Sequence, residues 1–135
     1  MKRIYLITLF ALMTVHLGSC KKLLGKDDES LLTKDPWIGD EMVSKVSGQS
    51  QTTDISSKTV EFNKKTDRYV IYNNGNEIET GDWAYDKKSK ILSLEPDDDL
   101  PESYDVIELT KDRLHLRQEG TRYGVSYSID IYYVR

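Results

Sequence analysis

The sequence predicts an all-β fold, a single small antiparallel up-and-down barrel of eight strands over residues 36–135. Apolar and polar side chains alternate with a period of two in this region, which is typical of strands with one buried face. Turn residues interrupt the alternation at short intervals. Closing such a sheet into a barrel removes its exposed edges. A two-sheet sandwich would produce a similar pattern and is the alternative.

Eight segments are expected as strands. They are residues 37–46, 58–63, 68–73, 77–85, 90–95, 103–109, 113–118 and 123–134. The last has the clearest alternation, and its inward face carries Tyr123, Val125, Tyr127, Ile129, Ile131 and Tyr133. Asn74-Gly75 marks the clearest hairpin, because this pair accepts positive φ angles. Gly81 interrupts the fourth strand and predicts a bulge or bend there.

The N-terminus has the features of a secretory signal peptide. Lys2 and Arg3 precede an apolar run, residues 4–17, that is shorter than the roughly 20 residues of a membrane span. The run ends in Leu17-Gly18-Ser19-Cys20, which resembles the lipobox of bacterial lipoproteins. The resemblance implies that residues 1–19 are removed and that Cys20 carries diacylglycerol and palmitate chains. Two or three such chains hold a protein firmly to a membrane.

Residues 20–35 are expected to form a flexible, solvated tether between the lipid and the folded domain. Its run Lys26-Asp27-Asp28-Glu29 resembles the acidic tags that send some lipoproteins to the outer face of the outer membrane. A plain charged linker is the alternative. We therefore expect a lipid-anchored protein of the cell envelope at the outer membrane, on its periplasmic or surface face.

Composition excludes several classes of partner. Cys20 is the only cysteine, so we expect no disulfide, although the chain is exported. The formal net charge of −4 becomes −6 when cleavage removes Lys2 and Arg3, and this acidity excludes nucleic acid as a partner. Membrane attachment must then come from the acyl chains. We expect a monomer.

Several stretches resemble the lipocalin-like domains of bacterial envelope lipoproteins. They are Gly81-Asp82-Trp83-Ala84-Tyr85, Ile91-Leu92-Ser93-Leu94, the segment from Glu108 to Leu116, and the closing Tyr132-Tyr133-Val134-Arg135. The resemblance spans residues 36–135 and implies a barrel that holds a small apolar molecule. Residues 47–57 resemble, in position and length, the family's long first loop over the barrel mouth. One departure is Trp37-Ile38-Gly39, which reverses the family's usual order of glycine and tryptophan.

Few residues are suited to catalysis. His115 is the only histidine left after cleavage, and it is expected to face solvent on a strand. No Gly-x-Ser-x-Gly is present, and one histidine is too few for a zinc site. Glu95 and Asp97–Asp99 lack the spacing of a calcium loop and predict a solvated loop. We therefore expect no catalytic residue, no metal and no cofactor.

Aromatic side chains are the best candidates for a ligand site. Tyr123 and Tyr127 share the inward face of the last strand, and Trp83 and Tyr85 share a face beyond Gly81. Tyrosine offers an apolar wall with one polar group, which suits a cavity that orients a ligand. The same rings could instead fill a solid barrel. The two functional hypotheses are an anchored carrier of a small apolar ligand and, with a filled core, a surface-exposed interaction or inhibitor module.

The lipobox assignment makes a direct prediction. Cys20→Ala should abolish lipid attachment and leave unprocessed precursor, because the thiol that accepts the lipid is gone. Growth of cells with a radioactive fatty acid measures this, with the parent chain as the positive control. Uptake of label by the alanine variant, together with normal maturation, would show that the lipobox assignment is wrong.

Overall fold

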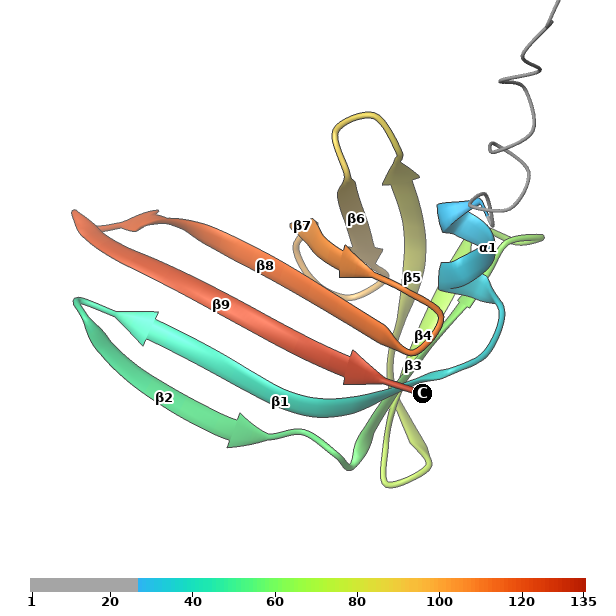
Figure 1. Cartoon of the computed structure of the whole chain (residues 1–135), viewed down its shortest axis with the longest axis horizontal. Helices are drawn as coiled ribbons and strands as arrows, with labels where there is room; N and C mark the ends of the chain where they lie inside the picture. The colour runs from blue at the N-terminus through green and yellow to red at the C-terminus, as the bar shows by residue number, and fades with distance from the viewer. Residues whose placement is uncertain (1–26) are drawn as a thin grey trace, which may run out of the picture.

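A computed structural model describes residues 27–135, which form one short helix and nine strands (Figure 1). The elements are α1 (Asp28–Thr33), β1 (Trp37–Val46), β2 (Gln49–Asp54), β3 (Lys58–Asn63), β4 (Arg68–Asn73), β5 (Asn76–Asp86), β6 (Ile91–Pro96), β7 (Glu102–Leu109), β8 (Arg113–Arg122) and β9 (Val125–Val134). The expected signal peptide and Cys20 lie outside the described residues. No helix of residues 27–135 is long and apolar enough to cross a membrane.

The sheet closes on itself as an antiparallel barrel. From β3 to β9 each strand pairs with the next, and β1 pairs with β9 from Ile38↔Val134 to Val46↔Tyr127. Trp37↔Val60 joins β1 to β3 and completes the circuit of eight strands. The predicted barrel is confirmed, and the two-sheet sandwich is wrong because no gap separates the first strand from the last.

The ninth strand, β2, was not predicted. Residues 47–57 were expected to be a mobile loop over the mouth, but Gln49–Asp54 pairs along the whole end of β1. Ser47 and Gly48 form the two-residue turn between them, with φ angles of 49° and 79°. All six side chains of β2 are exposed. The strand therefore buries no apolar face, and its sequence carries no alternation that could reveal it.

The last hairpin also turns later than the sequence suggested. β8 continues to Arg122, and the turn is formed by Tyr123 and Gly124, with φ angles of 52° and 77°. Tyr123 therefore sits at a hairpin tip with 97% of its surface exposed, and its predicted place on the inward strand face is wrong. The inward face begins at Val125, where β9 starts.

The irregularity of β5 lies at Ile78 instead of Gly81. Ile71 pairs with Glu79 while Tyr72 pairs with Glu77, so Ile78 is the extra residue of a bulge. Gly81 stays in register, and a Cβ there would lie 2.2 Å from the carbonyl oxygen of Glu95. Glycine is needed at this position because two backbones approach closely, and not because the strand bends.

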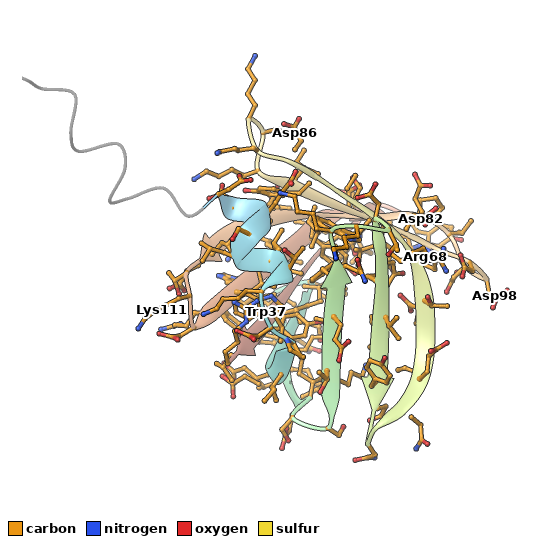
Figure 2. The ribbon with its side chains drawn as sticks, turned by 90° about the vertical axis from the view of Figure 1, so that its right-hand side faces the viewer. Trp37, Arg68, Asp82, Asp86, Asp98 and Lys111 are labelled. Atoms are coloured by element: carbon orange, nitrogen blue, oxygen red, sulfur yellow. The ribbon has the colours of Figure 1, made fainter. Side chains whose placement is uncertain are left out.

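The helix α1 closes one end of the barrel, so the expected solvated tether is wrong for residues 28–33. Leu32 is fully buried, and Trp37, which lies beneath α1 in Figure 2, donates its indole N–H to the carbonyl of Leu32 at 3.1 Å. The guanidinium of Arg135 stacks 3.6 Å from the centroid of the Trp37 ring. It also donates to the carbonyl of Leu31 at 2.6 Å. The C-terminus thus holds the helix in place.

The hydrophobic core fills the part of the barrel beneath α1. Its buried members are Leu32, Trp37, Val60, Phe62, Tyr69, Trp83, Leu92, Leu94, Tyr104, Val106, Leu114 and Leu116. Ile131 and Tyr133 of β9 pack against this cluster. The β1–β2 and β8–β9 hairpins project away from α1 (Figure 1).

The burial of Leu32 predicts that α1 is part of the folded domain. Leu32→Ala should lower the free energy of unfolding by about 2–5 kcal/mol, because it leaves a cavity among Trp37 and its neighbours. Urea denaturation of the two proteins measures the difference. Leu100→Ala is the matched control, since Leu100 is 77% exposed and should cost little. Equal stability of the two variants would show that α1 contributes no packing.

Candidate functional site

A cavity of about 720 Å³ opens at the end of the barrel from which the hairpins project. It is open to solvent and is lined by β1, the β8–β9 hairpin, the loop between β6 and β7 and the first residue of β7. The lining residues are Ser44, Val46, Asp99, Leu100, Pro101, Glu102, Gln118, Thr121, Arg122, Tyr123, Val125, Tyr127, Ser128 and Ile129. None of the buried core residues is among them, so the cavity and the core are separate parts of the barrel that the structure describes.

The strand β9 runs from the core into the cavity. Tyr133 and Ile131 pack on the core, while Ile129, Tyr127 and Val125, on the same inward face, line the cavity. Val46 of β1 lies beside them, because it pairs with Tyr127. Leu100 and Pro101 add apolar surface from the opposite loop. The cavity therefore has a continuous apolar wall along β9.

The four aromatic residues predicted to bind a ligand divide into two pairs. Tyr127 lines the cavity from the inward face of β9, and Tyr123 reaches it from the hairpin tip. Trp83 and Tyr85 are not among the cavity-lining residues. Trp83 packs edge-on against Phe62 with 5.3 Å between ring centroids, inside the core. The structure therefore does not bring the two pairs together.

Tyr85 helps to attach the helix that closes the barrel. Its hydroxyl lies 3.2 Å from the carboxylate of Asp28 in α1 and donates to it. Burial, followed by the negative charge of Asp28, raises the pKa of Tyr85 to about 12, so the hydroxyl remains a donor at neutral pH. Tyr85 therefore helps to hold α1 on the barrel, at the end opposite the cavity.

A layer of tyrosines and carboxylates in the barrel reaches the cavity at Glu102, its one member among the lining residues. Tyr104 of the core donates to Glu102, which also lines the cavity, and Tyr69 donates to Glu79 at 2.6 Å. Burial and the adjacent carboxylates raise the pKa of Tyr69 and Tyr104 well above its ordinary value. Burial, together with the charges of Glu79 and Glu102, also raises the pKa of Tyr133 to about 12. The layer is therefore acidic and keeps its hydroxyl protons.

The loop that carries Leu100 is fixed at its start. Arg68 donates to Asp97 at 2.8 Å and to Asp82 at 3.0 Å, and the backbone N–H of Asp97 donates to the carbonyl of Thr80 at 2.9 Å. Figure 2 shows Arg68 beside Asp82. The hydrogen bond from Arg68 lowers the pKa of the Asp97 carboxyl. Asp97 therefore anchors the loop.

No group of three or more His, Cys, Asp or Glu side chains within residues 27–135 is placed to bind a metal ion.

His115 lies in a buried ionic cluster that the sequence did not reveal. It is only 9% exposed, so its predicted solvent-facing position is wrong. Its Nε2 lies 2.6 Å from Oδ1 of Asp130, and Nε of Arg117 donates to the same oxygen at 2.8 Å. The ring stacks on Tyr132, with 4.3 Å between centroids. One signal was available, since Asp130 is the only charged residue in β9.

The cluster is on the outer face of the barrel, away from the cavity. His115 and Asp130 alternate with inward residues, namely Leu114 and Leu116 on β8 and Ile131 on β9. Burial alone would raise the pKa of Asp130, but hydrogen bonds from His115 and Arg117 keep it below its ordinary value. The carboxylate therefore stays charged and joins β8 to β9 from outside.

These features define a cup-shaped β-barrel, with a helix and packed core at one end and an open cavity at the other. The sequence matches the lipocalin-like domain family over residues 34–116, and the chain belongs to that family. No curated protein matches the sequence.

Two solved structures match the chain, and the first of them has a similar fold. One is a lipocalin-like protein from Bacteroides uniformis, 12% identical, with a TM-score of 0.52 over 78% of this chain and 99% of that one. The other is an uncharacterized protein from Bacteroides eggerthii, 15% identical, with a TM-score of 0.48 over 74% of this chain and 97% of that one.

The lowered pKa of Asp130 predicts an acid-sensitive contribution to stability. A carboxyl with a lowered folded-state pKa stabilises the fold above its ordinary value of 3.8, and this contribution disappears as the pH falls through the folded-state pKa. Asp130→Asn should therefore be less stable than the parent at pH 7, and the difference should shrink below about pH 4. Urea denaturation between neutral and acid pH measures it. Asp98→Asn, at an exposed site, is the control, and a difference that stays constant with pH would contradict the assignment.

Proposed function

We propose that this protein is a membrane-anchored lipoprotein of the cell envelope whose barrel binds a small apolar ligand in the open cavity. The observation that carries the proposal is the apolar wall of Ile129, Tyr127 and Val125 within a space of about 720 Å³. Cavities of roughly 300–1,000 Å³ with mostly apolar walls and a few polar groups are typical of small-molecule sites. Burial of an apolar ligand there contributes about 25 cal/mol per Å² before the costs of association.

The lining also restricts the polar end of the ligand. Glu102 and Asp99 contribute two carboxylates to the cavity, and Arg122 contributes one cation from the exposed hairpin. Glu102 also accepts a hydrogen bond from Tyr104 and so belongs to the acidic layer that contains Tyr69 and Glu79. A carboxylate or phosphate at the inner end of the ligand would be repelled there. We therefore propose a ligand with an apolar body and a neutral or cationic polar end.

Binding, and not catalysis, is the activity that we propose for the domain. His115 is engaged by Asp130 on the outer face and is not among the cavity-lining residues, which supports this choice. Attachment through Cys20 is supported by the lipobox alone, since that residue lies outside the described part of the chain. The anchor would hold the cavity close to the outer membrane, where apolar molecules are found.

Filling the cavity tests the proposal. Ile129→Trp should weaken binding of the neutral apolar probe N-phenyl-1-naphthylamine by about tenfold or more, because the indole occupies the volume that the probe needs. Equilibrium dialysis of the purified full chain measures the affinity. Ile107→Trp is the matched control, since Ile107 is 49% exposed and does not line the cavity. It should bind the probe as the parent does.

Stability measurements on the same variants separate the two functional hypotheses. In an open cavity the added ring fits, and Ile129→Trp should unfold at nearly the same urea concentration as the parent. In a solid barrel the larger side chain would be overpacked and cost about 1–3 kcal/mol. A destabilised Ile129→Trp protein, with no probe binding by the parent, would contradict the carrier proposal and favour the interaction module.

A further inference from the structure

The strand β2 lies outside the closed circuit of eight strands and leaves one edge of the sheet open. It pairs with β1 on one side, and no strand of residues 27–135 pairs with it on the other. In Figure 1 its outer edge faces away from the rest of the molecule. Closure was the feature that removed free edges, so a strand outside the closed circuit restores one.

The hairpin geometry identifies the backbone groups that point outward. In a two-residue hairpin the flanking residues, Val46 and Gln49, exchange both hydrogen bonds, and the direction then alternates along the strand. Ile55 follows the same alternation, since its N–H donates to the carbonyl of Asp40 at 3.1 Å. The odd-numbered residues of β2 therefore bond to β1. Ser50, Thr52 and Asp54 direct their N–H and C=O groups away from the sheet.

This edge has one charged residue, Asp54 at its end, and otherwise lacks the usual features that prevent pairing with another strand. Natural edge strands are protected by lysine, proline, a bulge or a covering segment. Residues 49–54 read Gln-Ser-Gln-Thr-Thr-Asp, and β2 pairs with β1 in continuous register without a bulge. All six side chains are exposed, so nothing in the described chain covers them. The edge can therefore accept a further antiparallel strand.

In place of the monomer expected from the sequence, we propose that β2 pairs with β2 of a second copy of this chain, antiparallel, about a two-fold axis at Thr52. An axis at Thr52 lets every outward-pointing residue of β2 exchange hydrogen bonds with the other copy, whereas an axis at Gln51 or Thr53 would leave one of the three without a partner within the strand. Thr52 is the central one of the three such residues. Two sheets would join into one that continues across the axis from β1 to β1 of the other copy.

The side chains of β2 are self-complementary in this register. Thr52 lies opposite Thr52 of the other copy, and Ser50 lies opposite Asp54, whose carboxylate can accept from the serine hydroxyl. Gln51 lies opposite Thr53. Threonine pairs across strands are favourable, whereas like charges directly opposite each other are not. Asp54 is the only charged residue of the strand and never faces another Asp54.

The size of the contact makes the association reversible. Six residues on each side bury less than the roughly 1,200 Å² of a standard stable interface. The association is therefore best trapped covalently. It depends on neither the cavity nor the lipid, so it can be tested independently of the proposed function.

Single cysteines measure the register. In the full chain with Cys20→Ser, purified in mild detergent, Thr52→Cys should form a disulfide-linked dimer under mild oxidation. Opposed Cα atoms in such a pair lie about 5.5 Å apart, within the range of a disulfide. Ser50→Cys is the matched control, because two copies of Ser50 would lie roughly 13 Å apart along the strands. We expect about tenfold more dimer for Thr52→Cys on a non-reducing gel.

A mixed experiment provides an independent readout. Ser50→Cys protein mixed with Asp54→Cys protein should form the heterodimer, because these positions face each other in the proposed register. Adding Thr52→Pro to both should abolish it, since proline removes an outward N–H at a position where an edge strand tolerates it. Equal cross-linking of Thr52→Cys and Ser50→Cys, or none for either Thr52→Cys or the mixture, would overturn the proposal.

Discussion

The pairing of β1 with β9 is the constraint on which the other features depend. It joins the first and last strands of the described chain and closes the barrel. At one end it brings Arg135 onto Trp37, and at the other it places Val46 beside Tyr127. The closed end and the cavity wall are therefore both consequences of one ladder. A fold with such distant pairing must close a long loop before these contacts form.

The charge of Arg135 is accommodated by backbone carbonyls and an aromatic ring. Its guanidinium donates to the carbonyls of Leu31, Leu32 and Asp35 and lies over Trp37. Burial lowers the pKa of Arg135, and the nearby Asp35 and Asp112 oppose this change. The carbonyls at the end of α1 lack partners within so short a helix, so the guanidinium satisfies them as it is desolvated. Helix and C-terminus thus stabilise each other.

The alternation of apolar and polar residues predicted the strands that have a buried face and missed the elements that bury little or nothing. β3 and β4 begin and end where the alternation of Val60, Phe62 and Tyr69 indicates. The polar strand β2 has no buried face, and α1 buries only Leu32 among its six residues. Neither element therefore produces a periodic pattern of apolar residues. Half of the candidate site was predicted. The alternation along the last strand correctly places Tyr127 on the inward face. That Tyr127 lines the cavity while Trp83 lies in the core depends on the stagger between strands, and no local sequence pattern records that stagger.

The inward side chains of β8 explain why one barrel is solid at one end and open at the other. Leu114 and Leu116 fill the interior beside β9, but the next inward positions are Gln118 and Gly120. A Cβ on Gly120 would meet the Tyr127 hydroxyl at 3.1 Å, so the ring of Tyr127 lies across the glycine. A leucine at this position would clash with that ring or displace it into the cavity. The open space therefore results from the polar Gln118 and the glycine Gly120, which follow Leu116 at the inward positions, with the ring of Tyr127 lying against the glycine.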